Sequence, residues 1–215
     1  MPTLIILTCV VLLPLLLSLW TSFTPFKLTK PDTLYRFVGF RNYERLIGDL
    51  DFWIAFGRTV LFLAIALNLE LVFGLGIALL INKITYGQRT LRTLMMFPMM
   101  FSPILVGFQW KYIFNDNIGL MNNFLREFGV IQPIPWLVDG ILANISIMAA
   151  EIWSSTSVFA ILLLAGLLGI PKDPIEAAKV DGCNSWQVFK NITLPFLMPF
   201  VFIAMTIRSL DVARA

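Results

Sequence analysis

Long, uninterrupted runs of hydrophobic residues dominate the chain. They cover residues 3–23, 59–81, 91–114, 141–170 and 195–214. A helix that crosses a bilayer needs about 20 consecutive apolar residues, whereas the strands of a membrane β-barrel alternate between apolar and polar positions. Because these runs are continuous and rich in Leu, Ile and Met, the pattern predicts an all-α integral membrane protein with five transmembrane helices visible.

Four polar connections separate these runs, at residues 24–57, 82–90, 115–140 and 171–194. The short second connection and its flanks carry Lys83, Arg89 and Arg92 and no acidic residue. Short loops rich in Lys and Arg stay in the cytoplasm. Alternation along the chain then predicts that the connection at 171–194 is cytoplasmic as well.

Composition supports a membrane protein and argues against catalysis. The chain is 58% hydrophobic and 13% charged, and its mean hydropathy is +0.83; soluble domains carry about 25% charged residues. The absence of histidine removes the commonest general base and metal ligand. The sequence also lacks a GxxxxGK[ST] phosphate loop and a basic stripe with interleaved aromatics. We therefore expect no enzyme activity, no cofactor or metal in this chain, and no nucleic-acid partner.

The connection after the fourth run is rich in helix start and stop signals. Pro171 ends the run, and Asp173-Pro174 followed by Glu176 resembles a helix start with an acidic capping box. Gly182 is placed to end that helix in a left-handed conformation. These signals predict a short helix with Asp173 as its N-cap and Pro174 at its first helical position.

A second short helix is predicted directly after this glycine. Asn184 can cap it, and it would cover residues 185–192, with Pro195 and Pro199 in the opening turns of the fifth span. The whole segment is then two short helices joined by a glycine turn at the membrane face.

This segment resembles the EAA loop of the permease subunits of ATP-binding-cassette (ABC) importers, most closely their carbohydrate subfamily. The matching residues are Glu176-Ala177-Ala178, Asp181-Gly182 and Ile192-Thr193-Leu194-Pro195, with Cys183 where Ala is usual. FVGFRNYERLI at 37–47 and LLGIP at 167–171 also resemble stretches of sugar permeases. The resemblance covers essentially the whole chain, 1–215, as a single permease domain.

The resemblance implies a type I importer permease fold, which usually has six helices, so we expect the C-terminal part of the domain to be missing. It implies a multi-pass protein of a bacterial or archaeal cell membrane that forms the path for a sugar or sugar-like solute. The implied partners are two separate ATPase subunits that hold the ATP and Mg, a second permease subunit and an extracytoplasmic solute-binding protein. The loop residues that would contact the ATPase are Glu176, Ala177, Ala178, Asp181 and Gly182.

Polar residues inside predicted spans mark candidate solute contacts, because such residues usually face a cavity. Aromatic faces and hydrogen-bonding side chains suit a sugar, which favours Gln109, Trp110, Glu151, Trp153 and Ser154. The alternative is that the Trp residues are interfacial anchors and that the hydroxyls hold helices together.

Two other functions remain open at this stage. Glu70, Glu151 and Arg208, if paired within the membrane, would favour a secondary transporter or channel. However, Arg208 and Asp211 are spaced to pair on one helix face. The second alternative is an ABC permease for a solute other than a sugar.

Overall fold

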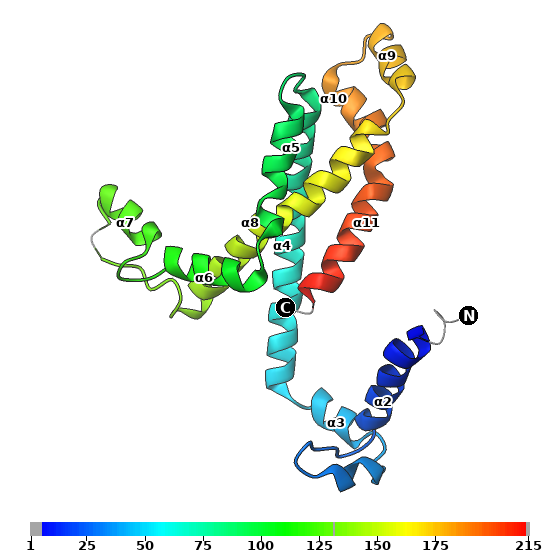
Figure 1. The fold of residues 1–215 in the computed structure, drawn as a ribbon, viewed down its shortest axis with the longest axis vertical. Coiled ribbons are helices and arrows are strands. Elements are labelled where there is room, and N and C mark those ends of the chain that lie inside the picture. Colours follow the sequence, from blue (N-terminus) through cyan, green and yellow to red (C-terminus); the bar gives the residue numbers. More distant parts are fainter. Residues whose placement is uncertain (1–5, 131, 214–215) are drawn as a thin grey trace. The chain divides into compact units, whose positions relative to one another are not determined.

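The computed structural model describes residues 6–130 and 132–213, and within them it contains helices and no β-strand. The chain divides into two compact units, residues 1–60 and 61–215. The helix bounds are as follows: η1 Thr8–Leu12, α2 Leu13–Ser22, η2 Pro31–Tyr35, α3 Arg41–Ile47, α4 Leu50–Lys83, α5 Gln88–Met96, η3 Pro98–Met100, α6 Pro103–Ile113, α7 Leu120–Glu127, α8 Gly140–Leu168, α9 Lys172–Val180, α10 Ser185–Val188, η4 Phe189–Thr193 and α11 Leu194–Val212 (Figure 1).

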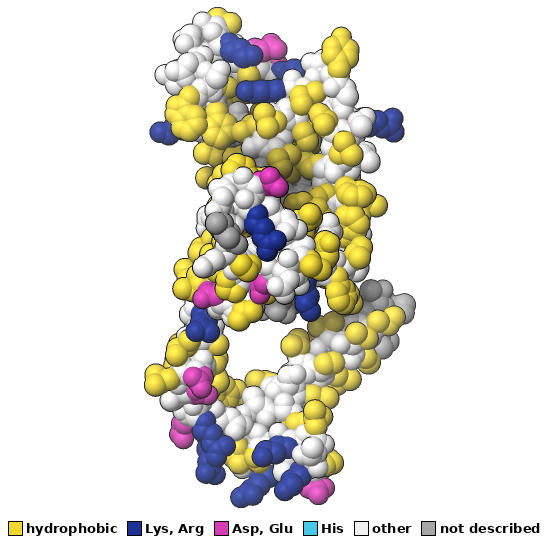
Figure 2. All heavy atoms as spheres, turned by 90° about the vertical axis from the view of Figure 1, so that its left-hand side faces the viewer, with side chains coloured by type: hydrophobic (Ala, Val, Ile, Leu, Met, Phe, Trp, Pro, Cys, Tyr) yellow, Lys and Arg dark blue, Asp and Glu magenta, His cyan; other side chains and the backbone are white. Residues whose placement is uncertain are grey.

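Three helices are long and apolar enough to cross a membrane: Leu50–Lys83, Gly140–Leu168 and the continuous stretch Ser185–Val212. The apolar helix Thr8–Ser22 is shorter. It covers most of the predicted span 3–23, of which residues 3–5 lie outside the described residues, as does residue 214 of the predicted span 195–214. Hydrophobic side chains are exposed over much of the surface, as Figure 2 shows for one face, which is how a surface in contact with lipid is built.

The predicted span 91–114 is not one straight helix. Its two halves, Gln88–Met100 and Pro103–Ile113, meet at an angle of 88°. Pro98 and Pro103 lack backbone donors, and Phe101 is extended. The Ser102 hydroxyl then caps the second half by accepting a hydrogen bond from the Leu105 amide at 3.4 Å. Hydropathy detects the apolar run but not this break.

In the first unit, the FVGFRNY stretch forms a compact connection. Gly39 has φ +61°, and the Val38 amide donates to the carbonyl of Phe23 at 2.9 Å. The Asn42 amide group donates to the carbonyls of Ser22 and Thr24 at 2.9 and 2.8 Å. The Asn42 side chain therefore satisfies carbonyls at and just beyond the C-terminal end of α2, where a helix leaves them without partners.

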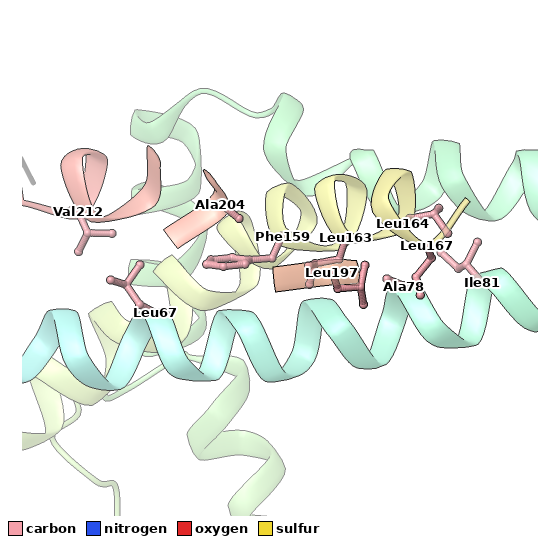
Figure 3. Packing of buried hydrophobic residues seen from close by; sticks show 10 residues of the cluster. All are labelled: Leu67, Ala78, Ile81, Phe159, Leu163, Leu164, Leu167, Leu197, Ala204 and Val212. Atoms are coloured by element: carbon pink, nitrogen blue, oxygen red, sulfur yellow. The ribbon is translucent and has the colours of Figure 1, made fainter. Parts of the chain in front are cut away.

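In the second unit, the core lies where α4, α8 and α11 meet (Figure 3). Phe159, Leu163 and Leu197 are fully buried there. Gly74 of α4 lies directly against α8, and a methyl group on it would come within 2.5 Å of Phe159 Cβ. Small residues at such contacts let membrane helices approach closely, because lipid gives no hydrophobic drive for their association.

The connection between α6 and α8 depends on the buried side chain of Asn122. Its Nδ2 donates to the carbonyls of Asp116 and Ile134, and its Oδ1 accepts from the Ile134 amide and the Trp136 indole at 2.9–3.2 Å. The Asn122 side chain thus joins two distant parts of the connection between α6 and α8, which in the sequence is recognisable only as polar.

The close approach of α4 and α8 gives a stability prediction with a matched control. Gly74→Ala should destabilise the protein by about 1–3 kcal/mol, because the added methyl group overpacks the contact with Phe159. Gly76→Ala adds the same methyl group two residues later, where nothing lies within 4 Å, and should be neutral or slightly stabilising. Thermal unfolding in detergent micelles measures both, and equal midpoints would contradict this packing.

Candidate functional site

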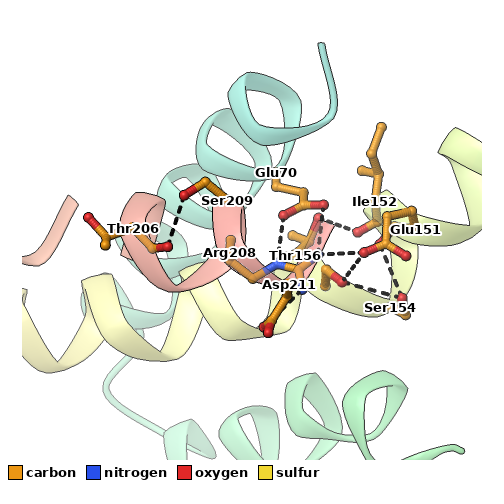
Figure 4. A network of polar contacts seen from close by, with 10 residues as sticks. Glu70, Glu151, Ile152, Ser154, Thr156, Thr206, Arg208, Ser209 and Asp211 are labelled. Carbon is orange, nitrogen blue, oxygen red and sulfur yellow. Dashed lines mark hydrogen bonds and ion pairs between the residues drawn. The ribbon is translucent and has the colours of Figure 1, made fainter. Parts of the chain in front are cut away.

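A cluster of charged side chains joins the three core helices. Arg208 of α11 donates through Nε to Glu70 Oε2 at 3.2 Å and through Nη2 to Glu70 Oε1 at 3.3 Å. The same Nη2 donates to Glu151 Oε1 of α8 at 2.5 Å, and Nη1 lies 3.5 Å from Asp211 Oδ2. Figure 4 shows the acids of α4 and α8 converging on this one guanidinium. We call Glu70, Glu151 and Arg208 the ionic cluster.

Burial makes the ionic cluster an energetic constraint on the fold. Glu70 is fully buried and Arg208 is 6% exposed. A charge removed from water is tolerated only when it is paired and hydrogen-bonded, and the planar guanidinium provides the two parallel donors that a carboxylate needs. The three helices must therefore meet where they do, since any other register would leave a buried charge without a partner.

Glu151 differs from Glu70 because its side chain remains 29% exposed. Together with Arg208, Ser154 and Ser155 it lines a cavity of about 440 Å³ whose other walls include Phe101 and Val106. The Ser155 hydroxyl donates to Glu151 Oε1 at 3.2 Å. One end of the ionic cluster thus lies in the protein interior. At the other end, Glu151 and Arg208 line the cavity beside the hydroxyl groups of two serines.

A row of aromatic rings runs beside this cavity. Phe101 stacks on Trp153 with centroids 6.4 Å apart, and Trp153 packs edge-on against Trp110 at 6.0 Å. The row continues through Phe114 to Trp136. A neighbouring cavity of about 310 Å³ is lined by Trp110 and by the buried Ser146, whose hydroxyl has no hydrogen-bond partner among the described residues.

Residues 169–184, which we call the α9 segment, connect the last two long helices and have a defined geometry. Helix α9 ends at Val180, and Gly182 has φ +80°. The Cys183 amide donates to the carbonyl of Ala178 at 2.9 Å and the Gly182 amide to that of Lys179 at 3.1 Å, which together make a Schellman motif. The predicted left-handed Gly182 is confirmed. Asn184 then caps α10, also as predicted, with a full capping box to Gln187.

Two local predictions for this segment were wrong. Helix α9 begins at Lys172 after an extended Pro171, so Asp173 and Glu176 do not form a capping box; Pro174 lies in the first turn, where no backbone donor is required. The predicted separate helix 185–192 does not exist either. Residues 185–212 form one continuous helix, through a π-helical turn at Phe189–Thr193 that leads past Pro195.

Comparison with known proteins identifies the family. Residues 70–213 match the family described as "Binding-protein-dependent transport system inner membrane component". The chain belongs to this family. It is a permease subunit of ABC importers, a multi-pass membrane protein and a transport component rather than an enzyme.

Relatives of this permease span its whole length. It is 35% identical to the trehalose/maltose transport system permease protein MalF of Thermococcus litoralis, over 100% of this chain and 72% of the relative. It is 34% identical to the probable ABC transporter permease protein y4oQ of Sinorhizobium fredii, over 99% of this chain and 68% of the relative. A crystal structure of a bacterial ABC transporter that imports the acidic polysaccharide alginate has the same fold, with a TM-score of 0.82 at 21% identity over 100% of this chain and 72% of that one.

The permease brings some of the sequence-predicted residues together and separates others. Glu151 and Ser154 line one cavity, and Trp110 and Trp153 contact each other beside it. Gln109 is exposed on α6. On the α9 segment, Glu176, Ala177, Asp181 and Gly182 are exposed, whereas Ala178 is buried.

The sequence did not reveal that Arg208 pairs mainly with Glu70. Arg208 does lie near Asp211, as the i, i+3 spacing predicts, but Glu70 is 138 residues away along the chain. The sequence does place an acid, Glu70, and a base, Arg208, inside apolar runs. Because charges inside a membrane almost always pair, this placement could have indicated an ion pair. The hydrophobic periodicity of the sequence does not indicate which of the acids contacts Arg208.

Loss of the guanidinium should destabilise the permease strongly. Arg208→Gln leaves two acids facing each other with no cation between them, so we expect a loss of about 3–5 kcal/mol in the free energy of unfolding. Asp211→Asn is the control, because its side chain is 53% exposed and a surface pair contributes about 0–1 kcal/mol. Denaturant titration in mixed micelles compares them, and a similar midpoint for both variants would contradict the structural role.

Proposed function

We propose that this permease forms the membrane path for a sugar or sugar-like solute and couples it to a separate ATPase through α9. The geometry of the α9 segment is the main support for the coupling proposal. The segment is a short helix with an exposed end at Asp181 and Gly182, fixed between two membrane-length helices, α8 and Ser185–Val212 (Figure 1). Such a helix can insert into a groove on a partner, and its motion is passed to both long helices.

Charge supports placing α9 on the cytoplasmic side, where ATP is available. Lys83 and Arg89 lie on either side of the loop between α4 and α5, and the α9 segment contains Lys172 and Lys179 and is followed by Lys190. The proposed partners are two ATPase subunits with their ATP and Mg, a second permease subunit and an extracytoplasmic solute-binding protein. The sequence match to the EAA loop of this family supports that set.

The relatives' names support a sugar-like solute, since the Thermococcus protein carries trehalose or maltose. The cavity chemistry agrees with this assignment. Hydroxyl groups can donate to Glu151, accept from Arg208 and exchange hydrogen bonds with Ser154, while Phe101 offers an apolar ring face. We assign the solute path to this cavity and to the neighbouring cavities that Trp110 and Trp153 line.

Cross-linking tests the coupling proposal. Cys183 follows the Gly182 turn directly, so a short bifunctional thiol reagent should join it to a co-purified ATPase in at least one nucleotide state. Cys183→Ser should abolish the product, whereas Cys9→Ser on η1 should leave it unchanged. The coupling proposal fails if no product forms in any nucleotide state.

Solute contact in the cavity can be tested separately. Ser154→Ala removes one hydroxyl from the cavity and should weaken apparent solute affinity by about 2- to 10-fold, the effect of one hydrogen bond. Ser209→Ala is the control, because its hydroxyl makes a similar intrahelical bond outside the cavity. Measuring uptake at a series of solute concentrations gives the apparent affinity of both variants. Unchanged affinity in Ser154→Ala would show that Ser154 does not contact the solute.

A further inference from the structure

The ionic cluster has two parts with different surroundings. Glu70 and Arg208 form a two-point pair, with Glu70 fully buried. The second contact, from Arg208 to Glu151, is a single bond at the edge of the cavity, where Glu151 is 29% exposed and also accepts from Ser155. A ligand in the cavity can therefore reach the second contact while the first remains intact.

The two helices joined by this second contact are the two that hold α9. Glu151 lies on α8, whose last residue is four positions before α9, and Arg208 lies on the continuous helix that begins at Ser185 after the Gly182 turn. At 1.5 Å per residue, Glu151 lies about 26 Å from the end of α8, and Arg208 about 35 Å from Ser185. Figure 1 shows both helices leading from the core to α9.

We propose that the Arg208–Glu151 contact is a latch that a polyhydroxylated solute opens, so that occupancy of the cavity changes the position of α9. The latch rests on the proposed function. Hydroxyls of the solute donate to Glu151 and accept from Arg208, replacing the bond between them with bonds to the solute. Arg208 remains anchored on α4 by Glu70, while α8 is released from α11 at the end far from α9.

The latch requires a difference in affinity between two states, because a ligand shifts an equilibrium only by binding one state better. The solute meets this requirement, since its hydroxyls reach both groups fully only when the contact is open. The Glu70–Arg208 pair keeps the guanidinium in place in both states. Glu70 is therefore a positioning residue, and Glu151 is the moving partner.

The experiment uses the complete transporter, permease with its ATPase, second permease and binding protein, in lipid nanodiscs. Glu151→Gln keeps the side-chain size and removes the charge, so it should mimic the open latch. We expect ATP hydrolysis without solute to rise about five-fold or more, the low end of measured coupling, and stimulation by the loaded binding protein to fall toward one-fold. Glu151→Asp keeps the charge on a shorter side chain and should give an intermediate rise.

Thr206→Ala is the matched control, because Thr206 is exposed on the same helix and bonds only within it. Three results would overturn the latch. Unchanged hydrolysis without solute, together with weaker solute affinity, would make Glu151 a solute contact only. Parallel loss of hydrolysis and thermal stability would make it a structural residue only. A wild type that assembles with its ATPase but shows no solute stimulation would overturn the proposed function, and the latch with it.

Discussion

One guanidinium shared by two acids determines how this permease is put together. In a membrane-spanning bundle the hydrophobic effect gives little preference among helix registers, because lipid is as apolar as the helix faces. A buried charge gives a strong preference, because an unpaired charge there is costly. Arg208 can satisfy Glu70 and Glu151 together only when α4, α8 and α11 meet at one point (Figure 4). The small residue Gly74 then permits the close contact that this point requires.

The same cluster connects the interior of the bundle to the cavity. Its buried pair belongs to the core, and its exposed acid belongs to the cavity. Two of the three helices it joins, α8 and α11, lead to the α9 segment, none of whose residues lines the cavity. In the proposed latch these two helices are the route from the cavity to α9, and the Schellman motif at Gly182 fixes the geometry at the far end.

Features that depend on local chemistry could be predicted from the sequence. Hydropathy located the apolar helices, Gly182 identified a left-handed turn, and Asn184 identified a cap, because each depends on neighbouring residues alone. Prediction from the sequence failed where distant parts of the chain decide. The break at Ser102, the continuous helix through Pro195 and the Arg208–Glu70 pair all depend on what packs against them. Asn122 gave no signal beyond its polarity, although its side chain holds a whole connection in place.

A distance measurement shows whether the ionic cluster controls the position of α9. Spin labels at Val180 on α9 and Leu80 on α4, both exposed, report this position in a complete transporter without other cysteines. We expect Glu151→Gln without solute to give the distance distribution of the solute-loaded wild type. If the variant without solute instead keeps the distribution of the wild type without solute, the cluster does not control α9.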